Sequence, residues 1–243
     1  MIHRLFHLTQ RFDRREESAL PRILPFALFI AFVALTYPAQ WAIELMADSE
    51  LTANTAMLWL YPFRIIVVLM TLLYYWPVYT ELHDKLWVGC KELAFTTIVG
   101  VVVYWLWVRM DWPWAMQSEP EGYNPFQEGA SLGLVLVGIR IFGAVVVVPL
   151  VEELFWRSFL IRFLIKSPYT SVPLGSFTPL SFGAIVVLFG LEHHLWLAGM
   201  MAGAAYNLLL YKTGRLWPCI VAHGLTNLIL SLHVLTTHEW QWW

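Results

Sequence analysis

The chain has 243 residues, of which 59% are hydrophobic and only 13% are charged. A soluble domain of this length carries nearly twice that charged fraction, so the composition excludes an ordinary soluble protein. The net charge is −2, so the chain has no excess of positive charge of the kind that binds nucleic acid, and we expect no nucleic-acid partner. Apolar runs of about 20 residues recur, each long enough to cross a lipid bilayer. The sequence therefore predicts an all-α, polytopic transmembrane helical bundle of about seven to eight spans.

Residues 1–129 are predicted to form a polar N-terminal arm followed by about three transmembrane helices. The arm covers residues 1–21, and the spans cover about 22–46, 56–80 and 93–110. Pro38 predicts a kink in the first span. Arg64 lies in the second span, near its start, where a single arginine usually snorkels to the interface rather than serving a function. Residues 111–129 are acidic and rich in proline, which predicts a loop.

The second half of the chain begins with the apolar run 130–165, which is too long for one straight span. Pro149 lies within it, so we expect a kinked helix or two helices that meet near that proline. Further helices are predicted at about 179–193, 195–211 and 216–236, followed by a short tail, residues 237–243. We expect residues 130–236 to form the catalytic helical core.

The charged connections predict an orientation. Basic residues collect in the N-terminal arm and in segments 81–92, 162–166 and 212–215, whereas the alternate connections are acidic or uncharged. By the positive-inside rule, this pattern predicts a cytoplasmic N-terminus and a C-terminus on the outside. We therefore expect a multi-pass integral protein of the cell membrane (plasma or inner membrane).

Three charged residues interrupt the run 130–165. Each charge near a bilayer centre costs roughly 2.5–3.5 kcal/mol, so Glu152, Glu153 and Arg157 need an explanation. Glu153 and Arg157 are four residues apart and share a helix face, which predicts a supporting ion pair. Glu152 points about 100° away from Glu153 and has no basic partner in its own helix. It is therefore the primary candidate for function.

Polar partners for Glu152 occur in later helices. Phe189-Gly-Leu-Glu-His193 ends one apolar segment, and His223-Gly-Leu-Thr-Asn227 places a histidine and an asparagine on one face of the last span. Two chemistries fit these residues. Glu152, His193 and His223 are suited to hold a divalent metal such as zinc, with an open position for water. Alternatively, Glu152 and His193 activate water directly, and His223 with Asn227 stabilises the oxyanion.

The template of the zincin metalloproteases is missing from the sequence. It contains no His-Glu-x-x-His motif. Cys90 and Cys219 match no metal-ligand spacing. Gly199 and Gly203 form a small-xxx-small pair, which predicts close packing between helix backbones.

The three polar motifs together resemble the CPBP family, which comprises the CAAX prenyl proteases of the second type and their bacteriocin-processing relatives, also called the Abi family. The motifs are Glu152-Glu153-Leu-Phe-Trp-Arg157, Phe189-Gly-Leu-Glu-His193 and His223-Gly-Leu-Thr-Asn227. Pro149 and Leu216-Trp217-Pro218 are also similar to the family pattern. The resemblance covers about residues 130–235. The tryptophan-rich, compact form is also similar to the bacterial CAAX-protease-related proteins that accompany exosortase systems.

This resemblance implies an intramembrane endopeptidase that cuts a membrane-associated peptide or protein, prenylated or not. It implies that Glu152 activates water or binds a metal, and that His193, His223 and Asn227 complete the catalytic set. Glu153 and Arg157 correspond to the supporting pair of the family. The family is classed with metalloproteases, although a metal-free glutamate mechanism has also been argued for it. Glu192 and His194 flank the second motif and are candidates only for supporting contacts.

Two alternative functions use the same residues. A non-catalytic peptide-binding or bacteriocin-immunity protein would recognise a peptide through the polar cluster without cutting it. A proton-coupled transporter would use Glu152 and His223 as a relay. Such a transporter predicts inverted repeats between the two halves of the chain. The polar residues instead lie almost wholly in the second half, which disfavours the transporter.

Overall fold

Helices dominate the part of the chain that a computed structural model describes, namely residues 18–46, 59–117, 122, 124–126 and 129–243. No β-strand occurs among these residues. Seven long helical segments are present: α2 (Leu20–Met46), α4 (Leu60–Tyr75), α5 (Cys90–Trp107), the continuous segment α6 to α8 (Ala130–Ile165), α9 (Pro179–Glu192), α10 (Trp196–Thr213) and α11 (Leu216–Thr237). The predicted all-α helical bundle is therefore confirmed.

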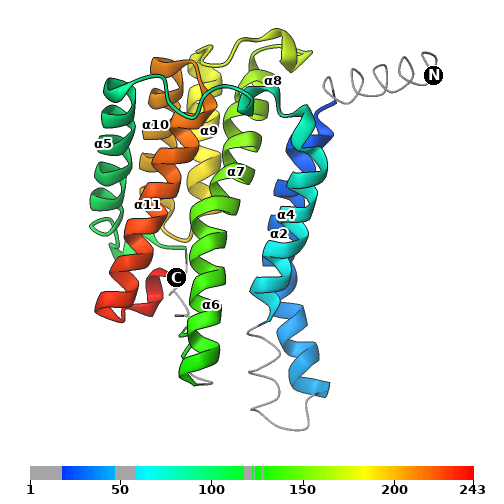
Figure 1. Ribbon diagram of the computed structural model, residues 1–243, viewed down its shortest axis with the longest axis vertical. Coiled ribbons are helices and arrows are strands. Elements are labelled where there is room, and N and C mark those ends of the chain that lie inside the picture. Colours follow the sequence, from blue (N-terminus) through cyan, green and yellow to red (C-terminus); the bar gives the residue numbers. More distant parts are fainter. Residues whose placement is uncertain (1–17, 47–58, 118–121, 123, 127–128) are drawn as a thin grey trace, which may run out of the picture.

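The helices form two groups on either side of the segment α6 to α8 (Figure 1). Helices α2 and α4 pack against each other on one side. Helices α5, α9, α10 and α11 gather on the other side, where α9 packs against α10 and α5 against α11. One buried cluster joins α4 to α7 and the start of α11, and a second joins α9, α10 and α11. The segment that carries Glu152 and Glu153 is thus central to the bundle.

Apolar outer faces fit this bundle to a membrane. Within the described residues, four helices are long and apolar enough to cross a bilayer, namely Leu60–Val78, Cys90–Trp107, Ala130–Ile165 and Leu216–Thr237. Shorter apolar helices cover Leu20–Leu35 and Pro179–Glu192. On α4, the exposed side chains of Phe63, Ile66, Met70 and Leu73 recur every three or four residues and make one apolar stripe. Such an exposed face is suited to contact with lipid.

The segment Ala130–Ile165 is one unbroken helix, so the alternative of two helices meeting at Pro149 is wrong. It contains two π-helical stretches, Gly143–Val147 and Leu154–Leu160, around the α-helical piece α7 (Val148–Glu153). In the first stretch, the N–H of Val148 donates to the carbonyl of Gly143, five residues earlier. A π-turn of this kind widens the helix next to a proline and keeps it continuous.

The basic connections lie at one end of the bundle (Figure 1). Segments 81–92, 162–166 and 212–215 lie at the end where α2 begins, whereas α9 and α11 both run toward the opposite end. Gly214, in the left-handed region with φ of 66°, ends α10 and turns the chain into α11. The geometry is therefore consistent with the predicted alternation of basic and acidic connections, while the orientation in the membrane stays a prediction.

A buried ion pair joins α2 to the central segment at this basic end. The guanidinium of Arg22 pairs with the carboxylate of Glu81 at 2.6 Å and also donates to Tyr169. Ser158, from the central segment, donates to the same carboxylate of Glu81. Burial alone would raise the pKa of the Glu81 carboxyl, but the hydrogen bonds from Arg22 and its positive charge lower that pKa below its usual value. These contacts link α2, the connection after α4 and the central segment.

We expect Gly224→Ala to lower the free energy of unfolding by about 1–3 kcal/mol, because a side chain there overpacks a helix contact. A Cβ atom at Gly224 in α11 would lie 2.6 Å from the backbone oxygen of Val145 in the central helix. Gly138→Ala is the matched control, since nothing lies within 4 Å of a Cβ atom there. The control should be neutral or gain up to about 1 kcal/mol from helix propensity. Thermal unfolding in detergent measures both, and equal stability of the two variants would contradict the close contact.

Several predicted features fall outside the described residues. They are the N-terminal arm up to residue 17, the start of the second predicted span up to residue 58, the acidic residues Asp48 and Glu50, and part of the loop 111–129 that includes Glu119, Glu121 and Glu128. The predicted tail, residues 237–243, contains a short 3-10 helix, Trp240–Trp242.

Candidate active site

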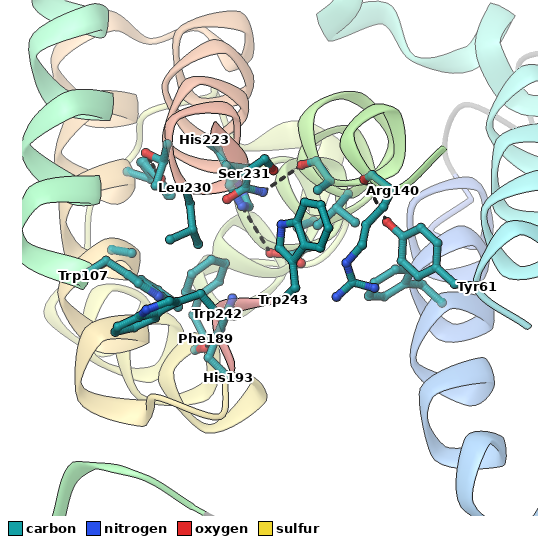
Figure 2. A pocket seen from close by; sticks show the side chains of 18 of the residues that line it. Tyr61, Trp107, Arg140, Phe189, His193, His223, Leu230, Ser231, Trp242 and Trp243 are labelled. Carbon is teal, nitrogen blue, oxygen red and sulfur yellow. Dashed lines mark hydrogen bonds and ion pairs between the residues drawn. The ribbon is translucent and has the colours of Figure 1, made fainter. Parts of the chain in front are cut away.

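One cavity of about 300 Å³ lies between the two helix groups. The four residues predicted to be catalytic all line it, although they come from three different parts of the second half of the chain: Glu152, His193, His223 and Asn227. Figure 2 shows His223 and His193 on one side of this cavity, and Arg140 with Tyr61 on another. The bundle therefore brings together side chains that are up to 75 residues apart, counting from Glu152 to Asn227.

Pro149 explains how the helix carrying Glu152 meets α11. Proline has no N–H, so Pro149 cannot donate to the carbonyl of Val145 or Ala144, the acceptors four and five residues earlier, respectively. The side-chain amide of Asn227 donates instead to the Ala144 oxygen at 2.8 Å. Gly224, one turn earlier in α11, leaves room for the Val145 oxygen. The predicted oxyanion residue Asn227 thus uses one of its two amide hydrogens to hold the central helix against α11.

Glu153 is the centre of a buried charge cluster. Its Oε1 atom accepts from Arg157 Nη1 at 3.1 Å and from His223 Nδ1 at 2.9 Å. The Glu153 and Arg157 side chains are fully buried. The guanidinium of Arg157 also lies 4.3 Å from the ring centroid of Phe189. The predicted pair of Glu153 and Arg157 is present in the structure, and it also orients His223, a contact that helix spacing did not indicate.

Glu152 faces a different direction, into the cavity. Its side chain is only 5% exposed, and its Oε2 atom has no hydrogen-bond partner. The nearest basic group is Nε2 of His223, at 4.0 Å from Oε2. Because Nδ1 of that imidazole is held by Glu153, Nε2 is left to face Glu152. A buried carboxylate oxygen without a donor is costly, and water or a substrate group would relieve that cost.

His193 follows the last residue of α9 and is fixed in one tautomer by its own helix. Its Nδ1 atom lies 2.7 Å from the backbone oxygen of Phe189. A carbonyl only accepts hydrogen bonds, so Nδ1 carries the proton and donates it to this oxygen. In the neutral imidazole, Nε2 is left with a free lone pair. Gly199 permits this packing, because a Cβ atom there would lie 3.1 Å from the His193 Cβ.

The predicted metal ligands do not form a metal site in this structure. Among the described residues, no group of three His, Cys, Asp or Glu side chains is placed so that it would hold a metal ion. In particular, Glu152, His193 and His223 line one cavity without forming such a group, so their arrangement does not fit the metal alternative.

Several cavity residues were not predicted to be functional. Arg64 lines the cavity, a position that the sequence did not indicate. Arg140 and Tyr61 are on the same side, and Trp242 and Trp243 reach the cavity from the tail. The presence of Arg64 in an apolar span was the one available signal, because a charge there needs a buried partner or a water-filled cavity.

The two residues that flank the second motif lie behind the cavity wall. Glu192 accepts a hydrogen bond from Trp156 Nε1 at 2.9 Å, which joins the end of α9 to the central helix. The backbone oxygen of His194 accepts from the backbone N–H of Gln117 at 3.0 Å. Neither residue lines the cavity, so both make supporting contacts in this structure.

Comparison with known proteins gives one family. Residues 134–229 match the model of the type II CAAX prenyl endopeptidase Rce1-like family. No curated protein and no solved structure matches the chain. The matched residues include all three polar motifs and the central helix with both glutamates. Residues 134–229 are therefore similar to the type II CAAX prenyl endopeptidase Rce1-like family, and this match confirms the resemblance found in the sequence.

Proposed function

We propose that this protein is an intramembrane endopeptidase that hydrolyses a peptide bond of a membrane-associated protein or peptide. The family points to a CAAX-type protease, and the apolar helices indicate an integral membrane protein. The observation that carries the proposal is the partnerless Oε2 of Glu152, in the same cavity as the free Nε2 lone pair of His193. A carboxylate and a neutral imidazole are the groups that general-base activation of water requires.

In the proposed reaction, Glu152 and His193 bind one water molecule and Glu152 removes a proton from it. The water oxygen attacks the carbonyl carbon of the substrate peptide, and a tetrahedral oxyanion forms. When the C–N bond breaks, the proton held by Glu152 passes to the leaving amine. The products are a new carboxylic acid and a new amine, and transfer of one proton between them gives a carboxylate and an ammonium group, so atoms and protons balance. No metal takes part in these steps.

His223 and Asn227 are suited to stabilise the oxyanion. Glu153 accepts from His223 Nδ1 and sets the ring so that Nε2 faces Glu152 across 4.0 Å. With a proton on Nε2, His223 donates to an oxyanion formed beside Glu152. Asn227 still has one amide hydrogen after its bond to Ala144. Glu153 and Arg157 act through His223 and are positioning residues.

The decisive experiment compares the protein termini in cells that produce the wild type with those in cells that produce Glu152→Gln. We expect new termini from a small set of membrane proteins only with the wild type, and the uncut forms to accumulate with the variant. Purified wild-type protein should then cut the same sequence in detergent, and elemental analysis with a chelation arm measures metal dependence directly.

The same experiment separates the proposal from a peptide-binding protein. If both strains yield identical termini, and the purified protein captures a candidate peptide that stays intact after long incubation, the endopeptidase assignment fails. Retained cleavage by Glu152→Gln would leave the peptidase function in place but would remove Glu152 from the role of base.

A further inference from the structure

Two arginines face the cavity from the side that carries none of the three motifs. Arg64 comes from α4 and Arg140 from α6, and both line the cavity. Their guanidinium carbons lie 4.8 and 4.9 Å from the ring centroid of Tyr61, which both cations therefore share. The hydroxyl of Tyr61 donates to the backbone oxygen of Arg140 at 3.3 Å and joins α4 to α6. Figure 2 shows Tyr61 and Arg140 across the cavity from Trp107 and His193.

Two donor atoms on this side of the cavity lack acceptors. Arg64 Nε and Trp243 Nε1 are both buried without a hydrogen-bond partner. Within the described part of the chain, no Asp or Glu forms an ion pair with Arg64. The Trp243 ring also lies 5.4 Å from the Arg140 guanidinium, which places this indole beside the two arginines. The cavity thus has unsatisfied donors at one side and the unsatisfied acceptor of Glu152 at another.

This arrangement is electrostatically suited to an anion. Two like charges that share one aromatic ring repel each other, and in an apolar bundle that repulsion is weakly screened. An intramembrane arginine commonly faces a cavity because it binds a substrate or ion there. The planar guanidinium fork matches a carboxylate with two parallel hydrogen bonds, which a single point charge does not offer.

We propose that Arg64 and Arg140, with the indole N–H of Trp243, bind a carboxylate of the peptide substrate. This inference rests on the proposed peptidase function, because the same cavity would then hold the bond to be cut beside Glu152. A peptide carboxylate is favoured over a lipid phosphate, since the arginines share a cavity of about 300 Å³ with Glu152 and His193, the groups proposed to act on a peptide bond. Binding of the carboxylate by Arg64 and Arg140 would select the substrate and determine which of its peptide bonds lies beside Glu152.

The test measures binding rather than cleavage, in detergent-solubilised Glu152→Gln protein. Three probes are titrated by calorimetry: N-acetyl-tetra-alanine with a free carboxylate, its C-terminal amide, and an N-acetyl-Ala-Ala-Asp-Ala amide. Loss of a charge-assisted hydrogen bond typically weakens binding by about 10- to 100-fold. We therefore expect at least one carboxylate probe to bind about tenfold or more tightly than the uncharged amide, and the two acids distinguish a chain terminus from a side chain.

Arginine variants connect this preference to the site. Arg64→Gln and Arg140→Gln should bring the acid and amide probes to within about twofold of each other, as expected after a charge-assisted bond is lost. Arg64→Lys, which keeps the charge but loses the fork, should give an intermediate preference. Arg109→Gln is the matched control, because Arg109 stacks on Trp105 and does not line the cavity.

Three outcomes would overturn the proposal. They are equal binding of all three probes to the parent protein, an unchanged preference in both Arg64 variants, and Arg64-dependent binding of short-chain phosphatidylglycerol with no selectivity among the peptides. The last result would assign the arginines to a lipid. Because Glu152→Gln is used throughout, carboxylate selectivity can be found even if the wild type cuts nothing, so failure of the peptidase proposal is recognised separately.

Discussion

Glu152→Gln is expected to lower the rate of peptide hydrolysis by about 10²- to 10⁴-fold, the range that removal of a general base produces. The fold should be retained, because Oε2 of Glu152 has no hydrogen-bond partner to lose and an amide is less costly to bury than a carboxylate. The unfolding midpoint in detergent should therefore stay unchanged or rise. A substrate recovered from the comparison of termini provides the assay, with turnover measured at saturating concentration.

The matched control is Glu92→Gln. Glu92 pairs with Arg215 at 2.6 Å at the basic end of the bundle, in a partly exposed position away from the cavity. Exposed pairs of this kind contribute about 0–1 kcal/mol, so the variant should keep both its activity and its stability. Equal losses of activity in the two glutamate variants would mean that Glu152 has no special role.

Arg157→Met is expected to lower the free energy of unfolding by about 3–5 kcal/mol, because it leaves the buried Glu153 carboxylate without its cation. Glu153→Gln should have a comparable effect through the uncompensated Arg157. The double variant, Glu153→Gln with Arg157→Met, should recover much of the lost stability, since an apolar and a neutral side chain then replace the buried charges. Thermal unfolding of the wild type, the two single variants and the double variant completes a double-mutant cycle, which measures the coupling between Glu153 and Arg157.

Activity should not recover together with stability. Glu153 also accepts the hydrogen bond from His223 Nδ1, and a glutamine there no longer provides a carboxylate that holds the ring. The double variant should thus be folded but slow. Strictly additive losses of stability would show that Glu153 and Arg157 are not coupled. Wild-type turnover of the double variant would show that Glu153 does not position His223.

The sequence predicted the helices well because each depends mainly on local composition. Apolar runs of about 20 residues, with turn residues between them, indicate membrane helices without knowledge of their neighbours. The second predicted helix of the core, 179–193, begins at Pro179 because Thr178 and Ser181 form a capping box. Gly214 likewise marks the end of α10. These signals lie within a few residues of the boundary that they set.

Long-range contacts were harder to predict, because spacing along one helix does not describe the next helix. The interval of four residues identified Arg157 as a partner of Glu153, yet nothing local identified His223 as a second one. Asn227 was expected to stabilise an oxyanion, but Pro149 also leaves a backbone oxygen in another helix that needs a donor. Nothing local placed Arg64 at the cavity either, since only the packed bundle shows which side chains line it.

The two π-helical stretches make the register of the active site depend on chain length. Each π-turn accommodates one residue more than an α-helical turn, and one residue corresponds to about 100° of rotation. Deleting a single residue from Gly143–Val147 would convert that stretch into an α-helix and turn Glu152 away from the cavity, without altering any catalytic side chain. Relatives of this domain should therefore keep the same number of residues between the positions of Gly143 and Glu152, even where those residues differ. A sequence alignment with a gap in this interval would match Glu152 with a residue that does not face the cavity.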